Sequence, residues 1–238
     1  KVMRKAFFDI ECNHLNADWG LLICACIKWS DKKTIETFRI TDHKQKSLND
    51  DSGVACAIRD SLEDADIIVT WYGKKFDVPY LQSRLLKWEK TIMSPNISHL
   101  DLWATARYQL RLSSNRLANI ERFLGLQATK TPINQGAWIE ALAGSKKHMK
   151  IVVDHCKQDV LMLEEAYNKM LPLIKNHPHL ALRGGPSDGC PKCGSINMEK
   201  MGHRITKVRR YQRWRCNDCG STCSTRVQDK REPLKFVA

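Results

Sequence analysis

The sequence contains no long uninterrupted run of hydrophobic residues, and no charged-then-apolar leader opens it. A membrane-spanning helix needs about 20 mostly apolar residues, so we expect no membrane span and no signal peptide. Internal repeats and low-complexity tracts are also absent from the sequence. A chain of 238 residues, 42% of them hydrophobic, can form a medium-sized globular domain with a small additional module. We therefore expect a soluble, cytoplasmic protein.

Acidic residues are few relative to basic ones, and the formal net charge is +13. Residues 183–238 contain 13 of the 39 basic residues but only 5 of the 26 acidic ones, so they carry most of the excess charge. Such a charge favours a polyanion, such as nucleic acid, as the partner. The alternative is a charge that only keeps the protein in solution.

An apolar segment, residues 3–12, predicts a buried strand that carries two carboxylates, Asp9 and Glu11. Residues two apart on a strand point to the same face, so these like charges lie close together. A bound cation removes the cost of burying them, and carboxylate oxygens suit a hard divalent ion such as Mg²⁺ or Mn²⁺. An edge strand with two solvated acids remains the alternative.

The apolar segments alternate between strand and helix patterns after an initial three-strand meander. We expect strands over residues 3–12, 21–29, 34–40, 65–71 and 99–102, and helices over residues 54–62, 76–88, 102–110, 116–124 and 149–171. This order predicts an α/β fold with a mixed sheet flanked by helices, and it resembles the order of a ribonuclease-H-like domain. The Pro- and Gly-containing segment 176–189 predicts a linker between a domain at 1–175 and a smaller module at 190–238.

Two later segments also carry acids in places suited to chemistry. Asp77 lies where a strand is expected to pass into a helix, although a helix N-cap is the simpler explanation for an Asp there. His155 and Asp159 are four residues apart on an expected helix and therefore share a face. An exposed face of an ordinary amphipathic helix is the alternative for this pair.

Taken together, Phe-Asp-Ile-Glu, Gly-x-x-Phe-Asp and His-x-x-x-Asp resemble, in order and spacing, the three motifs of the DEDD superfamily of 3′→5′ exonucleases. The resemblance covers roughly residues 3–171 and is strongest to proofreading domains of B-family polymerases and their stand-alone relatives. It implies that four acids hold two divalent ions, Mg²⁺ or Mn²⁺, which activate water and stabilise the leaving oxygen. The acids matching the family pattern are Asp9, Glu11, Asp77 and Asp159.

Two positions depart from the family pattern. Relatives usually have Asn where this chain has Tyr72, and they place either Tyr four residues or His five residues before the last Asp. Here His155 takes the Tyr spacing. Four residues turn a helix by about 400°, which returns His155 to within about 40° of Asp159. We therefore expect His155 to face the metals and to act as the general base.

Other residues near the second motif are candidates for contacts with nucleic acid. Tyr72, Lys74 and Lys75 could stack on the terminal nucleotide and neutralise it, although an aromatic residue at a strand end can equally belong to the core. Asp101 is expected to support the site without binding metal.

Ten cysteines would suggest disulfides in an oxidising compartment, but four of them form two Cys-x-x-Cys pairs and the rest are scattered through apolar segments. The pairs are separated by 22 residues, close to the spacing of a structural zinc site that stabilises a module too small for a large core. Each pair resembles a zinc-ribbon knuckle, with Cys223 left over as a free thiol. The expected ligands of the single Zn²⁺ are Cys190, Cys193, Cys216 and Cys219.

Between the two pairs, residues 207–215 alternate strongly enough to predict a strand rich in cations and aromatics. Cations neutralise phosphates and aromatics stack on unpaired bases, so we expect this strand to bind nucleic acid. The alternative is that its aromatics pack the small core, and a protein partner for the ribbon also stays open. The expected contacts are Lys207, Arg209, Arg210, Tyr211, Arg213, Trp214 and Arg215.

The resemblance thus implies a metal-dependent 3′→5′ exonuclease with a tethered zinc ribbon, acting on nucleic acid with a 3′ end. DNA is favoured over RNA because the resemblance is to proofreading domains. A catalytically inactive nucleic-acid-binding adapter and an endonuclease or recombinase of the same fold are the competing hypotheses.

Overall fold

The computed structural model describes the whole chain except residues 1–2, 48, 129–131, 135 and 227–238. The described residues divide into two compact units, Met3–Asn176 and a C-terminal unit that begins at His177. Among the described residues, no helix is both long and apolar enough to cross a membrane.

A five-stranded mixed sheet forms the centre of the first unit. Its strands, in the order in which they lie side by side, are β3 (Ile35–Arg39), β2 (Leu22–Trp29), β1 (Lys5–Cys12), β4 (Ile67–Thr70) and β5 (Ser98–Asp101). The pairs β1/β2 and β2/β3 are antiparallel, and β1/β4 and β4/β5 are parallel. All eight residues of β2 are buried, which requires cover on both faces of the sheet.

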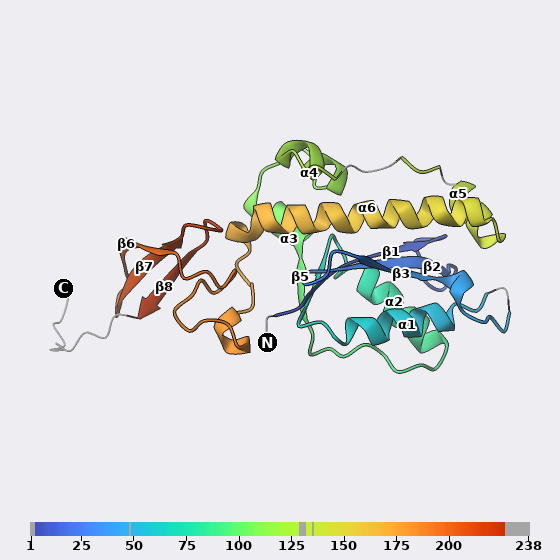
Figure 1. Ribbon diagram of the computed structural model, residues 1–238, viewed down its shortest axis with the longest axis horizontal. Helices are drawn as coiled ribbons and strands as arrows, with labels where there is room; N and C mark the ends of the chain where they lie inside the picture. Colours follow the sequence, from blue (N-terminus) through green and yellow to red (C-terminus); the bar gives the residue numbers. More distant parts are fainter. Residues whose placement is uncertain (1–2, 48, 129–131, 135, 227–238) are drawn as a thin grey trace. The chain divides into compact units, whose positions relative to one another are not determined.

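Helices provide that cover (Figure 1). The 25-residue α6 (Lys146–Met170) crosses one face, while α1 (Ser52–Leu62) and α2 (Asp77–Lys87) lie on the other. The remaining elements of this unit are the helices α3 (Leu102–Gln109), α4 (Leu117–Leu124) and α5 (Gly136–Leu142) and the short 3₁₀ helices η1 (Ile40–Asp42) and η2 (Leu171–Leu173). The predicted α/β architecture, a mixed sheet flanked by helices, is confirmed.

Several predicted boundaries differ from the structure by one to three residues, and one helix was not predicted. Helix α6 begins at Lys146 rather than at residue 149 because Ser145 caps it by accepting a hydrogen bond from the backbone N–H of His148. The strand expected over residues 65–71 is limited to β4. Helix α5 is only seven residues long and begins with Gly136, so it lacks the start signals by which a helix is recognised in a sequence.

The C-terminal unit contains a three-stranded antiparallel sheet with β7 (Arg210–Cys216) between β6 (Met198–Ile205) and β8 (Thr222–Arg226). The strand expected from residue 207 begins only at Arg210. The backbone N–H of Arg209 donates to Oγ1 of Thr206 at 3.1 Å, which closes a turn containing Lys207 and Arg209. Within the segment expected to be a linker, Leu180–Arg183 form the 3₁₀ helix η3.

Candidate metal centre and nucleic-acid contacts

The acids of the first motif lie on β1, the middle strand of the five-stranded sheet. The alternative of an edge strand is therefore excluded. Asp9 and Glu11 both point toward α6: Sγ of Cys156 lies 3.5 Å from Oδ2 of Asp9, and Nε2 of His155 lies 3.8 Å from Oε1 of Glu11. The shared face predicted from strand alternation is confirmed.

Helix α6 brings the third motif against the first. His155 and Asp159 are almost fully buried, with 4% and 7% of their surface exposed. Nε2 of His155 lies 3.9 Å from Oδ2 of Asp159, and ligand atoms of Glu11, His155 and Asp159 all lie within 4.8 Å of one another. Three residues from two elements distant in sequence thus surround one small volume.

Asp77 joins this group from α2, beside β1. It is the first residue of α2, and its Oδ1 accepts a hydrogen bond from the backbone N–H of Ile10 at 3.2 Å instead of capping its own helix. Burial, with smaller contributions from the negative charges of Asp101 and Asp159, raises the pKa of Asp77 to about 7 against the backbone hydrogen bonds that lower it. A cation at this place would relieve the repulsion between these carboxylates.

Trp138 on α5 was missed by sequence reasoning. Its indole Nε1–H donates to Oε2 of Glu11 at 2.8 Å, and its ring stands edge-on to the ring of His155 with centroids 6.4 Å apart. No sequence signal reveals this contact, because α5 itself is not predictable. Asp9, Glu11 and Asp159 open onto a cavity of about 650 Å³ that Trp138 also lines, with Arg122 of α4 on its wall.

The turn between β4 and α2 is held by Asp101. Its carboxylate accepts hydrogen bonds from the backbone N–H groups of Tyr72 at 2.9 Å and Lys74 at 3.2 Å. Tyr72 has a φ of 68°, a left-handed conformation that Asn adopts more readily than Tyr does. Its exposed ring packs edge-on against Trp103, and Nζ of Lys75 lies 6.0 Å from the ring centroid. The structure thus places Asp101 behind the turn, and its role in supporting the metal site stays a prediction.

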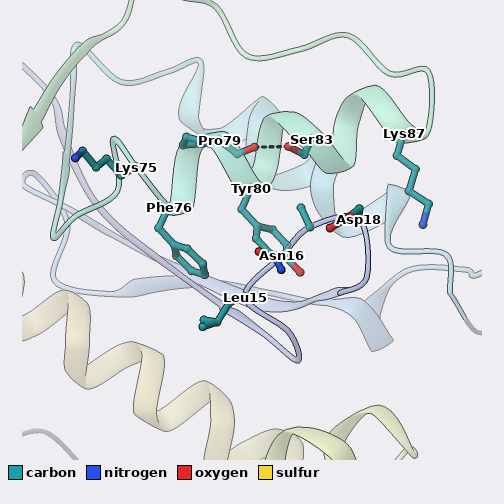
Figure 2. Close-up of a pocket in the computed structure, with 10 residues that line it drawn as sticks. Leu15, Asn16, Asp18, Lys75, Phe76, Pro79, Tyr80, Ser83 and Lys87 are labelled. Carbon is teal, nitrogen blue, oxygen red and sulfur yellow. Dashed lines mark hydrogen bonds between the residues drawn. The ribbon is translucent and has the colours of Figure 1, made fainter.

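A groove of about 640 Å³ runs between α2 and the loop 13–20 that follows β1 (Figure 2). Leu15 and Phe76 form an apolar part of its wall, and Lys75 and Lys87 stand at opposite ends of the view. Because Phe76 directly precedes Asp77, the groove begins beside the acids. Of the predicted contacts near the second motif, only Lys75 lines it.

A buried ion pair supports the loop side of this groove. Arg84 of α2 and Asp51 are both fully buried and form two hydrogen bonds of 2.7 and 2.8 Å. Nη1 of Arg84 also donates to the carbonyl oxygen of Ala17 at 2.7 Å, which fixes the loop. Sequence reasoning missed this pair, because its members are 33 residues apart with no shared pattern.

The four cysteines of the expected zinc site come together in the C-terminal unit. Their sulfur atoms all lie within 4.8 Å of one another, with separations of 3.7 Å for Cys190–Cys219 and 3.5 Å for Cys193–Cys216. Tetrahedral zinc–sulfur bonds of about 2.3 Å require sulfur separations of about 3.8 Å, so the cluster fits Zn²⁺. Cys223 lies on β8 opposite Trp214 and is not one of the four clustered cysteines.

The knuckle geometry favours a thiolate at Cys216, whereas burial raises the pKa of Cys190 and of Cys193. Gly194 and Gly220 have φ values of 79° and 71°, a left-handed backbone conformation that would be strained in a residue with a side chain. Burial opposes ionisation of Cys216, but hydrogen bonds from the backbone N–H groups of Cys219 and Asp218 outweigh it and lower the pKa of Cys216 to about 7.

The basic residues predicted on the ribbon strand do not form one surface. Strand alternation in β7 places Tyr211, Arg213 and Arg215 on one face and Arg210 and Trp214 on the other. As described above, Lys207 and Arg209 lie in the turn before the strand.

Comparison with known proteins agrees with this architecture. None of the curated proteins compared with the sequence matches it. Among solved structures, the fold is similar to that of the family B DNA polymerase from the hyperthermophilic archaeon Pyrobaculum calidifontis, with a TM-score of 0.60 and 17% sequence identity over 72% of this chain. The match spans 25% of the polymerase. Residues 6–171, which hold all five residues of the candidate metal centre, match the RNase H superfamily, and the chain belongs to that superfamily.

Proposed function

We propose that the chain is a metal-dependent 3′→5′ exonuclease of the DEDD type. Membership of the RNase H superfamily supports nuclease activity in general. The single observation that supports the finer proposal is that both acids of β1 and the His155/Asp159 pair of α6 line one cavity, while the first residue of α2, Asp77, accepts a hydrogen bond from the backbone N–H of Ile10, between the two acids of β1. These are the places from which the DEDD pattern supplies its acids.

The acids fit hard divalent cations. Asp9, Glu11, Asp77 and Asp159 offer only oxygen ligands, which suit Mg²⁺ or Mn²⁺, and the raised pKa of Asp77 reflects its burial first and the negative charges of Asp101 and Asp159 second. Two such ions, when bound, would activate the attacking water and stabilise the leaving oxygen of the phosphodiester.

His155 is the proposed general base. Its Nε2 lies between carboxylate oxygens of Glu11 and Asp159, at 3.8 and 3.9 Å, so it faces the same volume as the acids. Neutral imidazole can accept a proton from water at Nε2, and the edge contact with Trp138 limits rotation of the ring. The expectation that the Tyr spacing directs His155 to the acids agrees with these distances.

The zinc ribbon is proposed to hold one structural Zn²⁺ and to bind the nucleic acid substrate. DNA is the favoured substrate because the fold is similar to that of a DNA polymerase. A cytoplasmic location is proposed because none of the ten cysteines, all of which the structure describes, forms a disulfide, a state that a reducing compartment maintains. A protein partner for the ribbon is the competing proposal.

The test of the proposed function is digestion of oligonucleotides labelled at either end, with free or blocked 3′ termini, in Mg²⁺ or Mn²⁺. An exonuclease of this type releases mononucleotides from the 3′ end and stops when that end is blocked. Cleavage of blocked or circular substrates would instead identify an endonuclease or recombinase. Binding without cleavage in either metal would identify the inactive adapter.

A further inference from the structure

The register of the ribbon sheet places three arginines and a tyrosine on one face. In β7, Tyr211, Arg213 and Arg215 alternate onto the same side, and Arg204 of β6 lies directly opposite Tyr211. Directly opposed residues of antiparallel strands point to the same side, so Arg204 joins the other three. We call these four residues the arginine face. Arg204 did not belong to the set expected from sequence, because its strand shows no basic alternation.

The charges of this face are available to a ligand. Arg204, Arg213 and Arg215 are exposed, and Tyr211 is half-buried at the centre of the sheet. None of the three guanidinium groups forms an ion pair or hydrogen bond with any residue that the structure describes. Glu199 of β6, which lies opposite Arg215 of β7, is the single acid among the described strand residues of this face. The face therefore keeps an uncompensated positive charge.

The opposite face of the same sheet is engaged in contacts of its own. Nζ of Lys200 lies 5.5 Å from the centroid of the Trp214 ring, whose Nε1–H donates to Oγ1 of Thr225 at 2.9 Å. A guanidinium nitrogen of Arg210 lies 3.0 Å from Nδ1 of His203. The aromatic and basic groups on this side thus stabilise the ribbon. Trp214 thus has the contacts expected of an aromatic residue that packs the small module.

We propose that the arginine face binds single-stranded DNA, with its arginines on phosphates and Tyr211 stacked on a base. Arg213 and Arg215 lie two residues apart, about 7 Å along the strand, so they can contact neighbouring phosphates. A half-exposed aromatic ring amid such cations is a combination that binds unpaired strands, because every base offers a face for stacking. This inference rests on the proposed function, because it assigns the surface that would hold the exonuclease's substrate.

The test compares two double variants of the full chain that each remove two positive charges from the ribbon. Arg213→Ala with Arg215→Ala alters the arginine face, and Lys200→Ala with Arg210→Ala is the matched control on the other face. Binding to a fluorescent single-stranded DNA is measured by anisotropy over a range of salt concentrations, without Mg²⁺ or Mn²⁺. The arginine-face variant should lose about 0.7 in log–log salt slope per lost phosphate contact, while the control keeps the wild-type slope.

Two further variants separate the contributions and guard against misfolding. Arg204→Ala, as a single substitution, should reduce the salt slope. Tyr211→Ala should weaken binding to single strands at an unchanged salt slope, with little effect on duplex binding. One zinc per chain in each variant verifies that the ribbon is intact. Equal losses in the two double variants, or none in the arginine-face variants, would overturn the proposal.

Failure of this proposal is distinguishable from failure of the proposed function. Single-turnover cleavage of a 3′-ended oligonucleotide by the wild-type chain, measured at saturating enzyme in Mg²⁺, reports the chemical step separately from binding. Cleavage together with DNA binding that does not depend on the arginine face would overturn only the arginine-face proposal. DNA binding that depends on the arginine face, without any cleavage, would overturn the proposed exonuclease function and leave the proposed binding surface standing.

Discussion

Trp138 holds the carboxylate of Glu11 from α5, a helix that the sequence does not predict. Its indole Nε1–H donates to Oε2 of Glu11 at 2.8 Å, and the same ring stands edge-on to His155, 6.4 Å between centroids. One side chain therefore orients both an acid of the first motif and the proposed base of the third. The contact leaves Oε1 of Glu11 directed toward His155, 3.8 Å from its Nε2.

Trp138→Phe should lower the single-turnover rate about tenfold. The substitution keeps an aromatic edge against His155 but removes a hydrogen bond to a charged group, which contributes about 1.5 kcal/mol or more. The concentration of Mg²⁺ needed for half-maximal rate should rise, because Glu11 loses its orientation. Trp138→Leu, which also removes the aromatic edge, should be slower still. A wild-type rate and wild-type Mg²⁺ dependence for Trp138→Phe would contradict a positioning role.

Asp9→Asn and Asp77→Asn should each reduce cleavage by several orders of magnitude while the chain remains folded. Each removes a charged ligand from the proposed two-ion site. The amide oxygen at position 77 can still accept the N–H of Ile10, so the fold should persist, as thermal unfolding would show. Asp60→Asn, at an exposed position of α1, is the control. Near-normal turnover of either variant in saturating Mg²⁺ would exclude the metal site.

His155→Ala should cost about 10² to 10⁴ in single-turnover rate, with a much smaller effect on substrate affinity. The wild-type rate should fall on the acid side, as Nε2 becomes protonated, and the alanine variant should lose that part of the profile. His155→Tyr should recover part of the loss, because relatives use Tyr at this spacing. An alanine variant with the wild-type rate at saturating substrate would show that no side-chain base is needed.

The sequence predicted those parts of the site that follow from local periodicity. Asp9 and Glu11 share a face because strands alternate, and His155 faces Asp159 because helices repeat every 3.6 residues. The four-cysteine cluster likewise follows from its spacing. Periodicity could not exclude the wrong alternative, an edge strand over residues 3–12, because a local pattern does not distinguish a central strand from an edge strand.

The contacts that the sequence could not predict depend on pairing between distant segments. Trp138 meets Glu11 across 127 residues, and Arg84 meets Asp51 across 33. Sheet register is of the same kind: the alternation of β7 is local, but the placement of Arg204 opposite Tyr211 depends on the bulge in β6 between Lys200 and His203. A one-residue change in register would move Arg204 to the other face.

The last prediction concerns His99, whose Nε2 lies 2.8 Å from Oγ1 of Thr70. Burial, aided by the positive charge of Lys74, lowers the pKa of His99 to about 4 from its ordinary value of 6.5. Between these values the unfolded chain binds a proton that the folded chain does not. The free energy of unfolding should therefore fall as the pH is lowered from about 6.5 to about 4, by at most about 1.4 kcal/mol per pH unit.

Asp77 acts in the opposite direction over nearly the same range, so the measurement needs a background without it. Its pKa is raised to about 7 from 3.8, which means that the folded chain binds the proton and the free energy of unfolding falls as the pH rises. Urea unfolding of Asp77→Asn should therefore show a stability that decreases from pH 6.5 to 4. Adding His99→Gln should flatten that decrease, because contributions from other carboxylates are the same in both chains. Parallel pH profiles for the two would show that burial of His99 does not oppose its protonation.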